Sequence, residues 1–512
     1  MSSEQENNKR IAKNTFFLYI RMFITMLVGL YTSRIVLDNL GVSDYGIYNV
    51  MGGVIGMLVY VNQLLSGGTS RFLTIDLGRR DIECLRQTFS ISNTLALASC
   101  LIILVLGETV GLWFMNTHLN IDPARMPAAN WVYQCALVSC LLAVLQNPFT
   151  ASIIAHEKMG IYAYMSIFDV GVKLFIAFML SWSEFDKLKL FAFLILASNL
   201  INAIICAAVS LYQFEESNLR LAYSHEKFKD MMNYSGWNMI GGFANVLNNY
   251  GLNILLNIFF GTLINGARGI ALQVSNIVQQ FYSSFQTASV PQIIKYYAQG
   301  DLKGMGHLIC NSSKYGAYLL LCIIMPIVFN IDDFLMIWLG QRPEYTSWFT
   351  RLILFQILFQ AIDVPVGNGI QAVGRMKLPN LTAALFYLSV FPLSYMAFKF
   401  GADPVMGYCI YLIFTPFIML VDLLILRKYT GFSLRMFISK VLSPLFLVIL
   451  VISLASYFIM RFIIGDGFFM FATRCIFCFV ITCVVILWGG VSRSVRLQIF
   501  NGLVKKLSGQ GV

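Results

Sequence analysis

Residues 89–115, FSISNTLALASCLIILVLGETVGLWFM, form a long apolar stretch of the kind that decides the fold. Glu108 is its single charged residue. A helix rises 1.5 Å per residue, so about 20 apolar residues cross the ~30 Å hydrocarbon core of a bilayer. Only helices and closed barrels satisfy their backbone hydrogen bonds there, and barrel strands need a shorter, alternating pattern. The stretch is therefore predicted to be a transmembrane helix.

Similar stretches fill the rest of the chain and are separated by short polar breaks. Of the 512 residues, 58% are hydrophobic and 12% are charged, whereas a soluble chain carries about 25% charged residues. The sequence therefore predicts an all-α polytopic membrane protein of about 14 transmembrane helices, over residues 14–37, 45–66, 89–115, 129–152, 160–182, 189–212, 234–260, 263–285, 312–330, 349–372, 378–398, 404–426, 438–462 and 468–490.

The distribution of positive charge predicts the orientation of these helices. With a cytoplasmic N-terminus, 24 of the 36 Lys and Arg residues fall on the cytoplasmic side, 9 on the outer side and 3 inside helices. Cytoplasmic breaks carry the excess of Lys and Arg in membrane proteins, so both termini are predicted to be cytoplasmic. The net charge of +11 thus reflects topology, and we expect no nucleic-acid partner. The first apolar stretch is too long for the core of a signal peptide, so we expect no cleaved leader.

Glycine, aspartate and proline residues that commonly mark turns and helix ends recur at a spacing of 220 residues, which later falls to 217. This predicts two six-helix lobes of equal orientation, residues 1–213 and 214–428, followed by two additional helices and a basic tail, residues 429–512. Parallel repeats of this kind are a transporter architecture, with the substrate site between the repeats. The clearest recurring pairs are Gly41 and Gly261, Gly46 and Gly266, Asp81 and Asp301, and Pro148 and Pro365.

Each predicted lobe has one arginine inside an apolar segment near its start. These are Arg21 in the first segment and Arg268 in the eighth. Charges in bilayer helices are costly and commonly functional. Two guanidinium groups facing one cavity would suit a diphosphate, which they can grip bidentately. The alternative for each is a structural pairing with a carboxylate or with backbone carbonyls.

Three more charged residues lie in apolar segments. Asp169 and Lys173 are spaced i, i+4 on one helix face. They either neutralise each other, or line a cavity in which Asp169 titrates and Lys173 meets phosphate. Asp363 lies near a helix break and either binds a coupling cation or sits at a solvated rim. Asp169 and Asp363 are thus candidate ion-coupling residues, and Lys173 is a candidate substrate-binding residue.

The seventh segment carries a stripe of asparagines on one helix face, within an arc of about 120°. Amides in bilayer helices often hydrogen-bond to neighbouring helices. Because five on one face exceed what such bonding needs, we favour a wet wall suited to a sugar-bearing cargo, with Asn245 and Asn249 as candidate substrate-binding residues. The stripe comprises Asn238, Asn245, Asn249, Asn253 and Asn257.

Two breaks predicted to be cytoplasmic, residues 67–88 and 286–311, are longer than a turn. The first intersperses apolar residues with arginines, which suits either a helix lying in the headgroup plane or a solvated basic loop.

Motifs for catalysis, nucleotide binding and metal binding are missing from the sequence. It has no P-loop, H-E-x-x-H or G-x-S-x-G pattern. Its four histidines are scattered, and the single C-x-x-C, Cys475 to Cys478, lies in an apolar segment where cysteine packs as a small hydrophobe. We therefore expect no enzyme activity, no catalytic residues, no metal and no cofactor.

Three pieces of sequence resemble the bacterial polysaccharide and O-antigen lipid flippases. That family belongs to the multidrug/oligosaccharidyl-lipid/polysaccharide exporter superfamily. The pieces are the lead-in NKRIAKNT (8–15), the stretch SRIVLDNLGVSDYGIYNV (33–50) with its L-G-x-x-x-Y-G turn, and AHEKMG (155–160). The resemblance covers essentially the whole chain, including a plan of six, six and two helices.

The resemblance implies a flippase that moves polyprenyl-diphosphate-linked oligosaccharide across the bacterial cytoplasmic membrane by alternating access, for the synthesis of O-antigen, capsule or exopolysaccharide. It also implies membrane lipid, polysaccharide polymerase and chain-length machinery as partners. In related lipid II flippases, cavity arginines of the first and eighth helices are implicated with the lipid diphosphate, and Arg21 and Arg268 occupy comparable places. A second-helix arginine of those relatives has no counterpart, since residues 45–66 contain no Lys or Arg.

Two other functions compete with this interpretation. A cation-coupled drug antiporter of the same superfamily predicts an acidic cavity, whereas the charges noted inside the helices here are mainly basic. A membrane enzyme, such as a polysaccharide polymerase or ligase, needs a sizeable outer loop. The longest outer break, residues 331–348, is short and holds no histidine.

Overall fold

The computed structural model describes most of the backbone and, within it, most of the side chains. Side chains are left out at residues 3–24, 59–68, 70, 71, 75, 78, 79, 159–163, 166, 225, 232–243, 245, 284, 285, 287, 288, 291 and 459. The described backbone covers residues 3–79, 81–156, 158–217, 224–375, 377–463, 465, 467–491 and 496.

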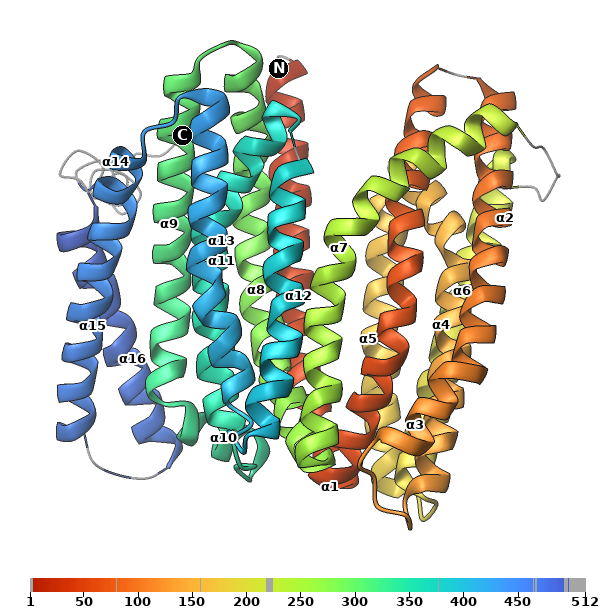
Figure 1. Cartoon of the computed structure of the whole chain (residues 1–512), viewed down its shortest axis with the longest axis horizontal. Coiled ribbons are helices and arrows are strands. Elements are labelled where there is room, and N and C mark those ends of the chain that lie inside the picture. The colour runs from red at the N-terminus through yellow and green to blue at the C-terminus, as the bar shows by residue number, and fades with distance from the viewer. Residues whose placement is uncertain are drawn as a thin grey trace. The chain divides into compact units, whose positions relative to one another are not determined.

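Residue contacts divide the chain into two compact units (Figure 1), which we describe one at a time. Unit 1 comprises Met1–Gly269 and Tyr387–Gly407, and unit 2 comprises Ile270–Phe386 and Tyr408–Val512. The predicted six-helix lobes, 1–213 and 214–428, and the extra segment 429–512 stay a prediction.

Unit 1 is built around α1, which packs against α2, α4, α5 and α7, while α4 also packs against α6. Its helices are α1 (Ser3–Arg79), α2 (Ile82–Leu106), the π-helix η1 (Gly107–Gly111), α3 (Leu112–His118), α4 (Met126–Ala155), α5 (Met159–Trp182), α6 (Lys187–Gln213), the 3-10 helix η2 (Glu215–Ser217) and α7 (His225–Phe260). The beginning of α8 (Thr262–Ala298) and the second half of α12 (Lys377–Lys399) belong to it as well.

Unit 2 is built around α9, which packs against α11 and against a C-terminal hairpin of α15 and α16 (Figure 1). Its elements are the rest of α8 and α12, α9 (Leu302–Phe329), α10 (Ile331–Leu339), α11 (Thr346–Val373), most of α13 (Met406–Thr430), α14 (Leu434–Phe437), the π-helix η3 (Ile438–Leu442), α15 (Ser443–Phe462), α16 (Phe468–Val485) and the π-helix η4 (Ile486–Gly490).

The predicted fold class is confirmed, since the described elements are helices and every predicted segment overlaps at least one of them. Among the described residues, nine helical stretches are long and apolar enough to cross a membrane. The other five predicted segments lie in α1, which holds the first two, and in α5, α7 and α8. The chain is therefore an all-α, multi-pass membrane protein.

One of the long predicted breaks is largely helical instead. Residues 67–79 continue α1, so they do not form the solvated loop that was one of the two predicted alternatives. Leu73 is fully buried there and packs with Leu85, Phe89 and Ala151. The loop alternative was wrong because the polar and basic residues of this segment lower its hydropathy without breaking its helix, whereas a helix in the headgroup plane stays a prediction. The second break, 286–311, is likewise mostly helical, with a turn around Gly300 between α8 and α9.

The repeated residues adopt the same local structures 220 residues apart. Gly41 interrupts α1 with φ 74° and ψ 167°, and Gly261 separates α7 from α8 with φ 80° and ψ −175°. A positive φ favours glycine because it has no Cβ. Asp81 caps α2 by accepting from the Cys84 backbone N–H at 3.0 Å. Asp301 caps α9 by accepting from the Gly304 N–H at 2.8 Å.

The second part of α1 and the start of α8 cross with their backbones in direct contact. A Cβ atom added at Gly46 would overlap the carbonyl of Thr262, and one added at Gly266 would overlap the carbonyl of Val42. Because each contact is the other displaced by 220 residues, the crossing is reciprocal. Next to it, the Ser43 and Thr262 hydroxyls are hydrogen-bonded at 3.0 Å.

We predict that Gly46→Ala and Gly266→Ala each destabilise the protein, because the new methyl group meets backbone that cannot rotate away. Overpacking of this kind typically costs about 1–3 kcal/mol. The measurement is the apparent melting temperature of the purified, detergent-solubilised protein. Gly29→Ala in the same helix α1 is the matched control, because a Cβ there has no neighbour within 4 Å. Wild-type melting of both crossing variants would contradict the reciprocal contact.

Candidate functional site

The asparagine stripe of α7 hydrogen-bonds to neighbouring elements near the helix crossing. Asn257 Nδ2 donates to Asn265 Oδ1 at 2.9 Å, and Asn265 Nδ2 donates to the Asn253 backbone and side-chain oxygens at 2.7 and 2.8 Å. Asn253 Nδ2 also donates to the Asn49 carbonyl at 3.1 Å. The Asn120 N–H donates to Asn257 Oδ1 at 2.8 Å. These amides therefore join α7 to α8, to α1 and to the segment after α3.

The wet-wall interpretation is wrong for part of this stripe. Asn253 and Asn257 are 2% and 0% exposed, so they hold helices together as bilayer amides commonly do. Asn249 is exposed and stays compatible with a cargo-facing role. The side chains of Asn238 and Asn245 lie outside the described residues.

Arg268 on α8 is buried in unit 1, with 6% of its surface exposed. Its Nη2 donates to the Asn249 carbonyl on α7 at 2.8 Å, and its Nε has no hydrogen-bond partner. Among the described side chains, no carboxylate forms an ion pair with it. A buried charge is costly unless it is neutralised, so this guanidinium is a candidate for binding an anion. The side chain of Arg21 lies outside the described residues.

Lys173 and Asp169 form an ion pair on α5, with Nζ and Oδ2 2.7 Å apart. The lysine side chain is 51% exposed and the aspartate 24%. This is the geometry of the self-neutralising alternative. A role in cargo binding or ion coupling remains a prediction for both residues.

Two carboxylates, Asp363 on α11 and Asp422 on α13, lie close enough to interact electrostatically within unit 2. Each has an enclosed Oδ1 atom without a hydrogen-bond partner. Nearby, the Tyr282 hydroxyl donates to the Ala361 carbonyl at 2.9 Å and is itself contacted by Gln286 Nε2. Asp363 as a whole is half-buried, so its role as a cation ligand or at a solvated rim stays a prediction.

Sequence reasoning missed Asp422, although the criterion that singled out Asp363 applies to it. Asp422 interrupts the apolar run IMLVDLLIL of the segment predicted at 404–426. Its proximity to Asp363 could not be read from the sequence, since α11 and α13 are separated along the chain by α12.

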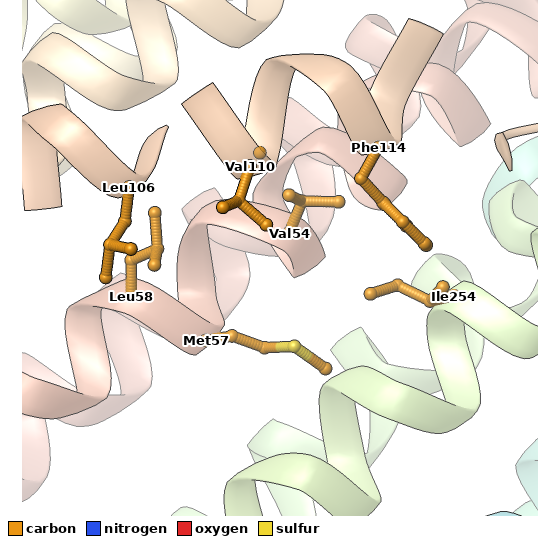
Figure 2. A pocket seen from close by; sticks show the side chains of 8 residues that line it. Val54, Met57, Leu58, Leu106, Val110, Phe114 and Ile254 are labelled. Atoms are coloured by element: carbon orange, nitrogen blue, oxygen red, sulfur yellow. The ribbon is translucent and has the colours of Figure 1, made fainter. Parts of the chain in front are cut away.

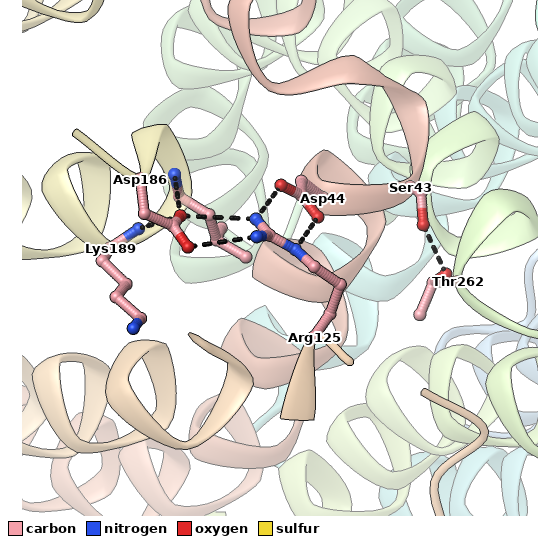
Figure 3. A network of polar contacts seen from close by, with 7 residues as sticks. Ser43, Asp44, Arg125, Asp186, Lys189 and Thr262 are labelled. Carbon is pink, nitrogen blue, oxygen red and sulfur yellow. Dashed lines mark hydrogen bonds and ion pairs between the residues drawn. The ribbon is translucent and has the colours of Figure 1, made fainter. Parts of the chain in front are cut away.

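An ionic network lies at the end of unit 1 where Gly41 interrupts α1 (Figure 3). The Arg125 guanidinium lies between two carboxylates: it binds Asp44 through Nε at 3.0 Å and through a short Nη2 contact, and Asp186 through Nη1 at 3.0 Å. Hydrogen bonds to Asp44 are the main reason that the pKa of Arg125 is raised. Asp186 also caps α6 by accepting from the Leu188 and Lys189 N–H groups. Arg125 thus ties α1 to the starts of α4 and α6.

A second ionic contact lies where α1 ends and α7 begins. Lys227 Nζ binds Asp76 Oδ2 at 2.7 Å, and the Thr88 hydroxyl donates to the same oxygen at 2.6 Å. Lys227 Nζ also donates to the Cys84 carbonyl at 2.5 Å. Asp76 is 2% exposed, so this contact fixes the start of α7 to α1 and α2.

Solved structures of membrane transporters share this fold. The lipid II flippase MurJ in an inward closed conformation matches with a TM-score of 0.65 and 13% identity, over 92% of this chain and 97% of that one. An inward-facing multidrug resistance MATE family transporter of the MOP superfamily matches with a TM-score of 0.65 and 14% identity, over 81% and 97%. A MOP superfamily transporter from Pyrococcus furiosus matches with a TM-score of 0.54 and 14% identity, over 81% and 95%.

No protein-family model and no curated protein matches the sequence. The structural matches confirm the transporter fold that the predicted resemblance implies. At 13–14% identity they show the fold alone.

We predict that Asn265→Ala destabilises the protein, because it leaves the Asn257 amide and the Asn253 oxygens without their partner. An unsatisfied buried polar group costs about 1–3 kcal/mol. Asn276→Ala, at an exposed position of the same helix, is the control and should melt as the wild type does. Apparent melting temperatures of the solubilised variants provide the comparison, and equal losses in both would speak against the amide network.

Proposed function

We propose that the protein is a flippase that translocates polyprenyl-diphosphate-linked oligosaccharide across a bacterial cytoplasmic membrane for surface polysaccharide synthesis. The observation that carries this proposal is the extent of the structural match. The flippase MurJ covers 92% of the chain, whereas the MATE structures cover 80–82%. Because MurJ and the inward-facing MATE family transporter match with equal TM-scores of 0.65, the wider coverage favours the flippase plan.

The charge of Arg268 supports an anionic cargo. A buried guanidinium without a carboxylate partner among the described side chains, and with an unpartnered Nε, suits a phosphate oxygen. In the proposed mechanism Arg21 and Arg268 bind the diphosphate while Lys173 lies along its path. Asn245 and Asn249 hydrogen-bond the glycan, and the polyprenyl tail stays in lipid. The two predicted lobes then expose this site alternately to each side.

No chemical step is proposed for the protein itself. We propose that both termini lie in the cytoplasm, as the positive-inside count predicts. The delivered units would pass to a polysaccharide polymerase and its chain-length machinery, which are proposed partners.

For energy coupling we propose the pair Asp363 and Asp422, with Asp169 as a weaker candidate. Two enclosed carboxylates with unpartnered oxygens do not both stay ionised without a cation. A proton or a small cation bound there would offset the negative charge of the two carboxylates at one stage of the transport cycle. Asp169 is already neutralised by Lys173.

A cation-coupled drug antiporter remains the second candidate function. The observation in its favour is the same acidic pair, together with the match to a multidrug resistance MATE family transporter. The two functions differ in cargo charge, so a single transport assay on cargo of both signs separates them.

We expect the purified protein in proteoliposomes to move a labelled polyprenyl-diphosphate oligosaccharide between leaflets, scored by access of a lectin to the sugar. Arg268→Ala and Arg21→Ala should each slow movement about 10- to 100-fold, because a charge-assisted hydrogen bond contributes about 1.5–3 kcal/mol and 1.4 kcal/mol is a factor of about ten in rate. Arg461→Ala, at an exposed position of α15, is the control. Lipid movement that persists in both arginine variants would support the flippase function but contradict Arg21 and Arg268 as its binding site. Gradient-driven movement of an organic cation alone would establish the antiporter instead.

We further expect that Asp363→Asn and Asp422→Asn abolish any stimulation of transport by an imposed proton or sodium gradient. Each replaces a carboxylate that can bind a cation by an amide of nearly equal size. Asp403→Asn, at an exposed position between α12 and α13, should leave the stimulation intact. Initial rates with and without each gradient are the measurement, and full stimulation in the Asn variants would contradict the coupling role.

A further inference from the structure

An apolar pocket of about 270 Å³ lies in unit 1 between α1, the region around η1, and α7 (Figure 2). The side chains that surround it are hydrocarbon apart from the thioether of Met57, and none carries a hydrogen-bonding group of its own. The lining residues are Val54, Met57, Leu58, Leu106, Val110, Gly111, Phe114 and Ile254.

One wall of the pocket is held open by the π-helix η1. Single π turns inside an α-helix are rare and occur often at functional sites. The Tyr133 hydroxyl of α4 donates to the Gly107 carbonyl at 2.7 Å. A Cβ at Gly107 would overlap Leu137, and one at Gly111 would overlap the Tyr133 hydroxyl. These contacts fix η1 against α4, so the wall on the pocket side cannot relax into the empty space.

The opposite walls belong to α1 and α7, whose seam is closed by glycines. Gly53 lies against the Asn253 amide, and Gly56 lies against the Tyr250 ring. Ile254 and Val54, next to this seam, are 8% and 7% exposed. The inner end of the pocket is therefore closed, and its polar neighbours face away into the amide network.

The mouth of the pocket lies on the apolar outer surface of α2 and η1. Leu106 and Val110, which line it, are 41% and 56% exposed. Val105 and Trp113, their neighbours on the same helical run, are 55% and 57% exposed. The stretch Ile82–His118, which holds these residues, is long and apolar enough to cross a membrane. An exposed apolar surface on such a stretch suits contact with lipid.

We propose that this pocket binds an acyl chain of a bilayer phospholipid. An apolar cavity offers water no partners, and one of roughly 150 Å³ already holds a benzene ring. The larger pocket here can therefore take a segment of hydrocarbon chain. No charged or polar side chain lines it to select a headgroup, so the chain supplied by the most abundant lipid is bound. The seated chain fills the space between η1 and α7. This inference stands whether or not the proposed transport function is right.

The test is photolabelling of the full-length protein in nanodiscs with a phosphatidylethanolamine that carries a diazirine near the middle of one acyl chain. We expect labels on Ile254 and Val54, identified by peptide mass spectrometry, because both line the pocket and are otherwise almost fully buried. Val110→Trp, which blocks the mouth, should lower labelling at both at least fivefold. Val105→Trp, equally exposed on the same helix but outside the lining, should leave it unchanged.

Three outcomes would overturn the proposal. Labelling at Ile254 and Val54 no higher than at the fully buried Leu256 would mean that no chain enters. Unchanged labelling in a folded Val110→Trp protein would mean that lipid reaches Ile254 by another route. Loss of labelling when an equimolar polyprenyl phosphate is added would assign the pocket to an isoprenoid tail instead. Val54→Phe, which fills the pocket from α1, replaces Val110→Trp if that variant does not elute as a single species.

Discussion

The direct backbone contact between α1 and α8 at Gly46 and Gly266 is the constraint on which the rest of unit 1 depends. In a bilayer, helices gain little from burying apolar surface against each other, so close packing through small residues and interhelical hydrogen bonds must hold them. The crossing brings Ser43 to Thr262. On the α7 side, the start of α8 is placed so that Asn265 reaches Asn253 and Asn257, and Arg268 reaches the Asn249 carbonyl. Larger residues at the two glycines would separate the helices and with them the groups that the amide network joins.

Local structures that require a particular residue type could be predicted from the sequence. Apolar length fixes the helices, because a bilayer leaves the backbone few other ways to form its hydrogen bonds. The pairs Gly41 with Gly261 and Asp81 with Asp301 were recognisable at a constant spacing. A positive φ selects glycine, and a helix N-terminus selects a short acceptor. These choices are local, so they persist in a sequence whose identity between repeats is low.

Features that depend on a distant partner could not be predicted. The polar and basic residues of 67–79 left a solvated loop open as one alternative. They extend α1 instead, because Leu73 packs against α2 and α4 and Asp76 pairs with Lys227 on α7. The asparagine stripe of α7 resembled a wet wall. Asn253 and Asn257 are instead hydrogen-bonded within the protein, to Asn265, Asn49 and Asn120. Periodicity gives the face of a helix on which a residue lies, whereas only the packing tells whether that face meets another helix or open space.

Each unit holds, among its described residues, a charged group with an enclosed atom that has no hydrogen-bond partner. In unit 1 the Arg268 guanidinium has a backbone carbonyl for a partner and no carboxylate. In unit 2 Asp363 and Asp422 lie near each other with unpartnered oxygens and no paired Lys or Arg. In a low-dielectric medium both arrangements are costly until an ion of the opposite sign arrives. A chain selected only for stability would replace them with apolar residues of similar size. Their presence is what an anionic cargo in one unit and a coupling cation in the other would require, because each ion then stabilises the unit only while it is bound.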